Sequence, residues 1–456
     1  MPLVANVSQI MDSSFPAHIF RSYNIRGLLH EVTPEIAKKA AMILVAMTGA
    51  KKVVIGRDMR ETSPELMRAA IDGVVSMGGD VANIGLCTSS MYNFAVTSDE
   101  SIGAGIMITA SHNPAEYNGI KMAKADGSPI AGSDILARFS EEFSSAAVPG
   151  SESSFDVLSP YLDQCIASSG VSSARAKIVI DYGNGMGATS MRPLCQRLGI
   201  DVIELYAEPD ARFPNHEANP AKEETLTDVK KKVLEVGADF GVAIDGDADR
   251  IAFIDNEGVS IAGDCTLALL SKDVLLRNPG GKILYSINAG WALDDAIRAN
   301  GGEPVQCPVG NTKIIKKMHE MTGALGGEVS SHFFFPEFHN LEAIDFAFLK
   351  VLSAWKTFGG TFADLVRPFR SYANSAEVNI HTEKGDEAIA VLRERYESKA
   401  TKVITIDGLR FEFDHDWWFL VRKSNTEPLV RVTVEAKNIE VMERERDAIV
   451  AVVQSL

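Results

Sequence analysis

Long apolar runs and a basic N-terminus are both missing from this sequence of 456 residues. The longest uncharged apolar stretch near the N-terminus, 40–47, is far shorter than the roughly 18 residues that a membrane helix needs. No Lys or Arg precedes Arg21, whereas a secretory signal peptide begins with basic residues. We therefore expect a cytoplasmic protein that has no membrane as a partner.

Cysteine is scarce and scattered. The five cysteines lie far apart and include no CxxC pair: Cys87, Cys165, Cys195, Cys265 and Cys307. An odd, dispersed set is typical of reduced thiols and argues against a disulfide framework or a zinc site. A nucleophilic cysteine is the alternative to buried inert thiols. The sequence also lacks the GxxxxGK[ST] motif, which excludes a P-loop kinase.

Acidic residues outnumber basic residues in this sequence. Lys and Arg number 45 against 61 Asp and Glu, a formal net charge of −16, within an ordinary globular composition of 46 % apolar and 23 % charged residues. Such an acidic surface repels nucleic acid, so we expect no nucleic-acid partner. A small anionic substrate needs local positive groups or a metal ion to overcome that field. At about 150 residues per domain, the length predicts about three domains.

A strand–helix–strand pattern occurs three times. Each copy begins with a short apolar run suited to a buried parallel strand, at 52–55, 177–180 and 282–285. An amphipathic helix that ends at glycine follows, at 63–77, 188–198 and 291–299. A second strand comes next, at 81–84, 202–205 and 304–307. Three related α/β domains would place later loops of each copy at comparable strand ends, where open α/β sheets bind ligands.

The C-terminal part departs from this pattern. It has β-rich segments at 409–413, 417–421 and 429–434 and a helix at 438–454, which together predict a small α+β domain. Segments rich in turn-forming residues predict linkers at 144–159 and near 368–375.

The first loop with chemical potential is 109–114, Thr-Ala-Ser-His-Asn-Pro, directly after the apolar run 105–108. A serine at a strand end, before a proline that stops the strand, points outward. Ser111 is therefore a candidate nucleophile or phosphoryl carrier. The alternative is a hydroxyl that only caps the turn.

The second loop carries Asp245, Asp247 and Asp249 after the apolar run 241–244. Three carboxylates at alternate positions can converge on one hard cation. Arg250 and Asn256 stand at the sixth and twelfth positions, where a calcium EF-hand needs glycine and glutamate. Magnesium fits this loop better, and an acidic hairpin turn is the alternative.

The third loop runs from Gly326 to His332. In extended chain Glu328 and Ser330 point the same way, and this pairing suits adjacent sugar hydroxyls. His332 is either an acid or base beside the ligand or a loop histidine with a structural partner.

The fourth loop combines two arginines with short polar side chains: Arg422, Ser424, Asn425, Thr426 and Arg431. In an acidic chain such a cluster predicts a phosphate cradle. A solvated surface turn is the alternative.

From 20–27, Phe-Arg-Ser-Tyr-Asn-Ile-Arg-Gly, to the loop at Arg422, the four motifs follow the order and spacing of a known family. The chain resembles the α-D-phosphohexomutases, in particular the phosphomannomutase/phosphoglucomutase branch. The resemblance implies three related α/β domains with mixed sheets and a smaller C-terminal α+β domain around a central cleft. We place the domains at 1–150 with the phosphoserine loop, 160–262 with the metal loop, 263–368 with the sugar loop and 369–456 with the phosphate loop.

The resemblance also implies roles for the candidate residues. Ser111 would carry the phosphoryl group, and Mg²⁺ would be held by Asp245, Asp247, Asp249 and an oxygen of phospho-Ser111. Sugar hydroxyls would bind Glu328 and Ser330, and the unreacting phosphate would bind Arg422, Ser424, Asn425, Thr426 and Arg431. The family also uses five positions around the reacting groups, here Arg21, His112, Lys121, Arg250 and His332.

The implied activity is that of an intramolecular phosphotransferase. A hexose 1-phosphate and a hexose 6-phosphate, of mannose or glucose, would interconvert through a bound hexose 1,6-bisphosphate. Electrostatic positioning carries most of the catalysis in phosphoryl transfer, which suits a metal ion and aligned cations. Lys121 and His332 are equal candidates for moving the proton. Sugar phosphates would be the partners, and the protein would be a monomer or a homodimer.

Three alternatives stay open. The first is a phosphoglucosamine mutase, although Val329 stands where that branch typically has glutamine. Asn24 and the segment 340–343 also depart from the usual pattern of the phosphohexomutase family. An NAD(P)-dependent dehydrogenase is another, because 183–188 matches GxGxxA and Glu204 follows about 20 residues later. A strand-to-helix turn needs small residues in any case. A non-catalytic sugar-phosphate sensor is the third.

Overall fold

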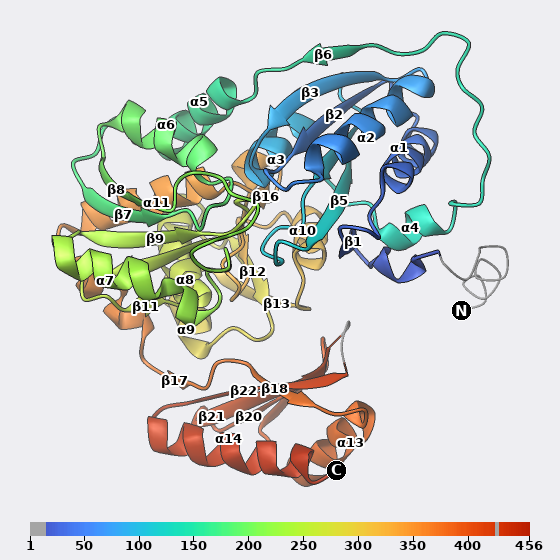
Figure 1. Cartoon of the computed structure of the whole chain (residues 1–456). Helices are drawn as coiled ribbons and strands as arrows, with labels where there is room; N and C mark the ends of the chain where they lie inside the picture. The colour runs from blue at the N-terminus through green and yellow to red at the C-terminus, as the bar shows by residue number, and fades with distance from the viewer. Residues whose placement is uncertain (1–14, 425–427) are drawn as a thin grey trace. The chain divides into compact units, whose positions relative to one another are not determined.

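The computed structural model describes residues 15–424 and 428–456 and forms two compact units. The first unit comprises Met1–Ile261 with Ser330–Phe362, and the second comprises Ala262–Val329 with Ala363–Leu456. Figure 1 follows the chain through their helices and strands. Within the described residues, no helix combines the length and the apolar character that crossing a bilayer requires.

The first sheet of the first unit has six strands in the order β1-β5-β4-β2-β3-β6. Its strands are β1 (Ile25–Leu28), β2 (Lys52–Arg57), β3 (Asp80–Leu86), β4 (Ala104–Ile108), β5 (Tyr117–Lys124) and β6 (Glu152–Ser154). Strand β2 is parallel to β3 and β4, whereas β5 is antiparallel to both β1 and β4, so the sheet is mixed. Its helices are η1 (Ala17–Ile19), α1 (Pro34–Thr48), α2 (Ser63–Ser76), α3 (Ser89–Thr97) and α4 (Gly132–Leu136).

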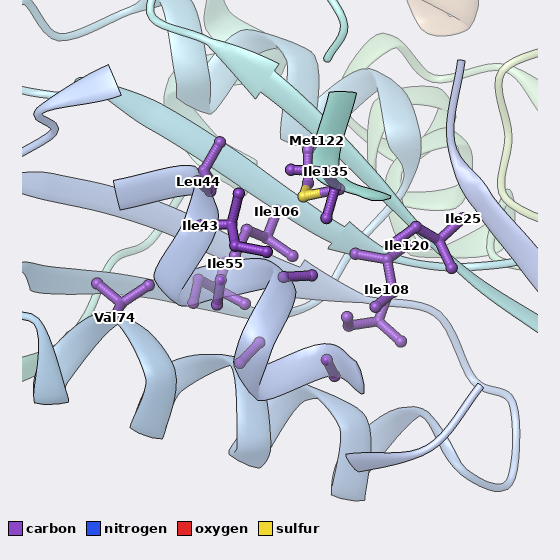
Figure 2. Packing of buried hydrophobic residues seen from close by; sticks show 14 of the residues in the cluster. Ile25, Ile43, Leu44, Ile55, Val74, Ile106, Ile108, Ile120, Met122 and Ile135 are labelled. Atoms are coloured by element: carbon purple, nitrogen blue, oxygen red, sulfur yellow. The ribbon is translucent and has the colours of Figure 1, made fainter. Parts of the chain in front are cut away.

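The core of this first domain lies between the sheet and helices α1 and α2. Figure 2 shows Ile43 and Leu44 of α1 and Val74 of α2 with Ile55 and Ile106 of the sheet, all of them buried. Each such side chain contributes about 1.5–3 kcal/mol when it leaves water. Helix α1 starts where the hydroxyl of its N-cap, Thr33, accepts a hydrogen bond from an amide of the first turn.

The second sheet of the first unit has the order β11-β10-β9-β7-β8. Its strands are β7 (Lys177–Asp181), β8 (Asp201–Leu205), β9 (Phe240–Ile244), β10 (Ile251–Asp255) and β11 (Ser260–Ile261). Here β7 is parallel to β8 and β9, and β10 is antiparallel to β9. The other elements of this unit are α5 (Leu158–Ser169), α6 (Ala188–Leu198), η2 (Glu223–Leu226), α7 (Thr227–Val236), β15 (Phe333–Phe335), η3 (Pro336–Phe338), β16 (Leu341–Glu342) and α11 (Ile344–Phe358).

The second unit repeats the parallel arrangement, because β12 (Lys282–Ser286) is parallel to β13 (Glu303–Cys307) and β14 (Leu325–Gly327). The helical elements here are α8 (Gly263–Arg277), α9 (Trp291–Ala299), α10 (Asn311–Met321) and η4 (Arg367–Phe369), and α12 (Phe362–Val366) begins at the junction of the units. The central strand of each copy, β2, β7 or β12, thus pairs with the strand after it and with the strand that precedes a polar loop. The predicted threefold α/β pattern is confirmed.

The C-terminal part is an antiparallel sheet in the order β17-β22-β21-β20-β19, with β18 also paired to β22. Its elements are β17 (Ala373–Asn374), β18 (Val378–His381), α13 (Gly385–Tyr396), β19 (Lys402–Ile404), β20 (Leu409–Phe413), β21 (Trp417–Lys423), β22 (Leu429–Ala436) and α14 (Ile439–Gln454). The predicted α+β domain is therefore confirmed. The predicted linker at 144–159 is partly wrong, because it contains β6, which adds a parallel edge strand to β3.

Candidate active site

Ser111 lies in a buried turn just after β4. Its side chain is only 4 % exposed, and its φ of 52° is in the left-handed region that few non-glycine residues adopt. Its amide donates to the hydroxyl of Thr109 over 2.9 Å. The predicted position of Ser111 after the end of a strand is confirmed, but the prediction that this serine points outward is wrong, because the residue is buried.

The three aspartates of the acidic loop lie between β9 and β10, and all of them are buried. One oxygen from each of Asp245, Asp247 and Asp249 lies within 4.8 Å of the others. Asp245 Oδ1 accepts from the amides of Asp249 and Arg250, at 3.0 and 3.1 Å, which folds the loop around that side chain.

The turn that holds Ser111 (109–114, the serine turn) and the loop that holds the three aspartates (245–250, the acidic loop) are in direct contact. The Ser111 hydroxyl donates to Asp245 Oδ2 over 3.1 Å. A Cβ at Gly246 would lie 2.4 Å from the Ser111 carbonyl oxygen, so this approach requires glycine. The fold therefore brings a serine hydroxyl from the first domain to a carboxylate group from the second.

The chemistry of the acidic loop fits a divalent cation. Within the described residues, Asp247 Oδ1 is buried without a hydrogen-bond partner, and such an atom is costly unless a ligand satisfies it. Burial raises the pKa of Asp245 well above its ordinary value, and repulsion from Asp249 and Asp247 adds to the rise. Carboxylate oxygens are the type of ligand that Mg²⁺ and Ca²⁺ take.

Lys121 of β5 supplies positive charge to the acidic loop. Its ammonium donates to Asp247 Oδ2 and Asp249 Oδ2, both over 2.7 Å. Burial opposes the charged form, but attraction to Asp247 and Asp249 prevails and raises the pKa of Lys121. For Asp249, burial is likewise outweighed by Lys121 and His332, which lower its pKa well below the ordinary value.

Arg250, His332 and Ser330 form a chain of contacts that reaches Asp249. Arg250 Nε donates to His332 Nε2 over 3.3 Å, and His332 Nδ1 lies 3.0 Å from the Ser330 hydroxyl. His332 Nε2 also lies 3.4 Å from Asp249 Oδ1. These side chains, which are far apart in the sequence, therefore share one polar network with the acidic loop.

His112, next to the serine, is held as a neutral imidazole. Its Nδ1 lies 3.2 Å from the Ser111 hydroxyl. The charge of Arg250, together with burial and Arg26, lowers the pKa of His112 well below its ordinary value. Near pH 7 this ring therefore adds no charge beside Ser111.

Sequence reasoning missed three residues that contact these loops. The Ser89 hydroxyl, in the first turn of α3, donates to Asp247 Oδ2 over 2.7 Å. Arg26 of β1 donates to the Asn113 side chain over 3.1 Å. Arg60 donates to the carbonyl of Ser111 over 2.9 Å. The only available signal was that Arg26 lies within the motif at 20–27; nothing near Ser89 or Arg60 distinguished them.

The glycine-rich turn at 183–188 packs against the acidic loop. The amide of Met186 donates to the carbonyl of Gly246 over 2.9 Å. A Cβ at Gly185 would lie 2.8 Å from that same carbonyl oxygen. This packing accounts for the small residues that had raised the possibility of a dinucleotide site.

In the second unit, the two arginines of the predicted phosphate cradle lie opposite each other on paired strands. Arg422 of β21 and Arg431 of β22 are register partners. Both pair with Glu377, at 2.8 and 3.0 Å. Ser424 follows β21, and its amide donates a hydrogen bond to the carbonyl oxygen of Leu429 over 2.9 Å. Asn425 and Thr426 lie outside the described residues.

Two further candidates make local contacts. Glu328, which follows β14 in the second unit, accepts from the amide of Gly310 over 2.8 Å. Arg21 lies before β1, and its amide and carbonyl bond to Asn24 and Ser133. Among the described residues, its guanidinium makes no hydrogen bond or ion pair with the Ser111 turn.

The fold and this site define an α/β enzyme in which a buried serine hydroxyl faces a carboxylate cluster suited to a divalent cation. Models of the phosphoglucomutase/phosphomannomutase α/β/α domains I, II and III match residues 17–144, 159–258 and 262–372. The model of the C-terminal domain of the same family matches residues 377–452. The chain belongs to the phosphoglucomutase/phosphomannomutase family, as its motifs predicted, and is therefore an isomerase of the mutase type.

Individual proteins agree with this assignment. The phosphomannomutase/phosphoglucomutase of Pseudomonas aeruginosa is 34 % identical over 440 residues, 94 % of each chain. A phosphoglucomutase/phosphomannomutase family protein of Burkholderia thailandensis has a crystal structure with 30 % identity, a TM-score of 0.88 and coverage of 97 % of this chain and 98 % of that one. The N-acetylphosphoglucosamine mutase of Aspergillus fumigatus, 13 % identical over 99 % of this chain and 98 % of its own, shares the fold at a TM-score of 0.62 and was solved with GlcNAc-6P and magnesium.

Proposed function

We propose that this protein interconverts the 1-phosphate and 6-phosphate of mannose or glucose, with Ser111 as phosphoryl carrier and a hexose 1,6-bisphosphate as bound intermediate. The observation that carries the proposal is the 3.1 Å contact between the Ser111 hydroxyl and Asp245, within a buried cluster of three carboxylates. A serine that only capped its turn would not need to be buried against that cluster.

Asp245, Asp247 and Asp249, with an oxygen on Ser111, would hold Mg²⁺. Bound there, the ion would neutralise charge on the phosphoryl group during transfer. Asp247 Oδ1, a buried acceptor without a hydrogen-bond partner among the described residues, supports this assignment. The raised pKa of Asp245 supports it as well, because it arises from burial and from repulsion by Asp249 and Asp247, which a cation would offset.

The transfer itself would break the bond between the Ser111 oxygen and phosphorus and form a new one from a sugar hydroxyl oxygen. The proton of that hydroxyl must leave to a base as the bond forms, and the released Ser111 oxygen takes up a proton to become a hydroxyl again. Lys121 is an ammonium bound to two carboxylates and is a poor base in that state. This favours His332, whose ring is already hydrogen-bonded to Ser330 and Arg250. Reversal with the other phosphate would then regenerate phospho-Ser111.

The cations around the serine would position and neutralise the phosphoryl group. Arg250 and Lys121 lie against the aspartates, and Arg26 lies against the serine turn. Fixed charges in a buried site stabilise developing charge without reorganisation, which is the main need of phosphoryl transfer. We assign Glu328 and Ser330 to the sugar hydroxyls. We assign the second phosphate to the fourth loop: Arg422, Ser424, Asn425, Thr426 and Arg431.

The test combines intact-mass spectrometry with a mutase assay. A fraction of the purified protein should be heavier by one phosphate, and Ser111→Ala should lose both that mass and the activity. Ser153→Ala, an exposed serine on β6, is the matched control and should keep both. Full activity in a chain that never carries phosphate would refute the assignment of Ser111.

Substrate choice is tested in the same preparation with mannose, glucose and glucosamine 1-phosphates side by side. We expect kcat/KM to be highest for mannose or glucose 1-phosphate. A clear preference for glucosamine 1-phosphate would move the chain to the phosphoglucosamine branch while leaving the role of Ser111 intact.

A further inference from the structure

Arg60 is a buried arginine that the proposed reaction does not use. It lies in the loop between β2 and α2, and its side chain is only 1 % exposed. Burial lowers the pKa of this guanidinium, although attraction to Asp58 opposes the shift. A charge held in the interior needs dedicated partners, because removing it from water is expensive.

Those partners are the main-chain carbonyls of the serine turn. Arg60 Nη2 donates to the carbonyls of Ser111 and Asn113, over 2.9 and 2.5 Å. Its Nη1 donates to the carbonyls of Pro114 and Tyr117, over 2.7 and 2.8 Å. One planar guanidinium thus binds four carbonyls between positions 111 and 117, from the Ser111 turn to the first residue of β5.

The Arg60 side chain also has partners outside the serine turn. Asp58 Oδ2 lies 3.2 Å from Arg60 Nε, and Asp58 Oδ1 accepts from the Arg60 amide and from the Ser63 hydroxyl. The ring of Phe213 lies 5.3 Å from the guanidinium carbon, within cation–π range. Besides the turn, the guanidinium therefore has one ion-pair partner and one aromatic ring contact.

The turn needs such support because Ser111 has a strained backbone. A serine at φ 52° lies in a sparsely populated backbone region and persists only where its surroundings impose that conformation. Both peptide groups that flank Ser111 are fixed, the amide by Thr109 and the carbonyl by Arg60. The hydroxyl of the same residue donates to Asp245.

We propose that Arg60 is a positioning residue that holds the Ser111 turn in its strained conformation and thereby sets the rate of phosphoryl transfer. The inference rests on the proposed role of Ser111. The planar fork is essential to it, because a lysine ammonium retains the charge but cannot serve four carbonyls in one plane.

The test is Arg60→Lys, assayed by single-turnover phosphorylation of Ser111 with hexose 1,6-bisphosphate and by steady-state kinetics. A displacement of about 1 Å at a reacting atom lowers rate by about 100-fold, so we expect losses of that order in the phosphorylation rate and in kcat. KM for the sugar phosphate should change by less than about threefold, because Arg60 lies beneath the turn and contacts main chain. Amide hydrogen exchange of 109–119 should rise in the variant.

Two further variants separate positioning from general destabilisation. Tyr161→Phe removes a buried hydrogen bond elsewhere in the same unit and should leave the phosphorylation rate unchanged. Asp58→Asn weakens the support behind Arg60 without touching the turn and should lower the same rate by a smaller factor. It also provides the measurement if Arg60→Lys does not fold.

The outcomes separate the inference from the proposed function. Wild-type protein that never becomes phosphorylated would overturn the role of Ser111 and the inference with it. Phosphorylated wild type together with a wild-type rate in folded Arg60→Lys, or in Asp58→Asn where Arg60→Lys is unfolded, would overturn the inference alone. So would a variant in which KM rises and kcat is unchanged, because that pattern belongs to a substrate contact.

Discussion

A buried carboxylic acid outside the proposed site should make the first unit less stable as the pH rises. Asp345, in the first turn of α11, is fully buried, and its Oδ2 accepts hydrogen bonds from the hydroxyls of Tyr161 and Ser190, both over 2.9 Å. Burial raises the pKa of Asp345 to about 6, although these two hydrogen bonds work against the rise. We therefore expect this carboxyl to titrate in the folded protein near pH 6.

The groups that face Asp345 carry no compensating charge. Tyr161 and Cys165 face it from α5, and Cys195 faces it from α6. Burial raises the pKa of all three, so each stays neutral between pH 4 and pH 8. The titration of Asp345 is therefore not coupled to an opposite change in its neighbours.

The direction of the pKa shift of Asp345 determines whether the free energy of unfolding rises or falls with pH. The pKa of Asp345 is higher in the folded chain than its ordinary value of 3.8, so folding favours the protonated acid. Its contribution is complete below pH 3.8 and is lost as the pH rises through about 6. The full change is about 3 kcal/mol, of which about 1.4 kcal/mol falls between pH 5 and pH 8.

The assay is amide hydrogen exchange of the peptides that cover α11, corrected for intrinsic exchange, at pH 5 and pH 8. Asp345→Asn should abolish about 1.4 kcal/mol of the pH-dependent loss in opening free energy. It should also destabilise α11 at both pH values by about 1–3 kcal/mol, because an amide N–H replaces an oxygen that has no partner among the described residues. Asp201→Asn, an exposed aspartate on β8, is the control. Equal pH slopes in wild type and Asp345→Asn would refute this reasoning.

Two further predictions concern the proposed ligands. Chelation with EDTA should abolish turnover, and added Mg²⁺ should restore it. At 100 times its Kd, Mg²⁺ should also raise the free energy of unfolding of the wild type by about 2.7 kcal/mol but leave that of Asp247→Asn unchanged. Turnover that is insensitive to the chelator would remove the role of the metal. Arg422→Ala should raise KM for the sugar phosphate about tenfold or more, through the loss of a charged hydrogen-bond donor. Lys423→Ala, on the same strand but paired with Asp386, should not, and unchanged kinetics in Arg422→Ala would detach that loop from binding.

Much of the fold could be predicted from the sequence because its strands are buried and regular. The expected helices at 188–198 and 291–299 and the strand at 409–413 coincide with α6, α9 and β20. Buried parallel strands appear as continuous apolar runs, and glycine marks the helix ends. Strand β6 escaped prediction because Glu152–Ser154 is polar and exposed and gains its structure only by pairing with β3.

Some residues of the candidate site could likewise be predicted from the sequence, and others could not. Ser111 and the three aspartates were found because their polar residues follow apolar strands. Arg60 and Ser89 were missed because their roles depend on long-range contacts: Arg60 reaches carbonyls more than fifty positions away, and Ser89 reaches Asp247. No local pattern distinguishes such an arginine from a surface one. Only the placement of the chain in space reveals it.

The spacing between serine and aspartates is set by helix α3. The amide of Ser89 donates to the carbonyl of Asp247 over 2.7 Å, and the hydroxyl of Ser90 donates to the carbonyl of Ala248 over 3.1 Å. The Ser90 hydroxyl in turn accepts from the amide of Ile344, the first residue of α11. Short bonds at a helix N-terminus therefore tie the first domain to the acidic loop of the second. Because Ser111 lies in the first domain and its carboxylate partners lie in the second, the distance that the proposed chemistry requires is fixed by packing within a single unit.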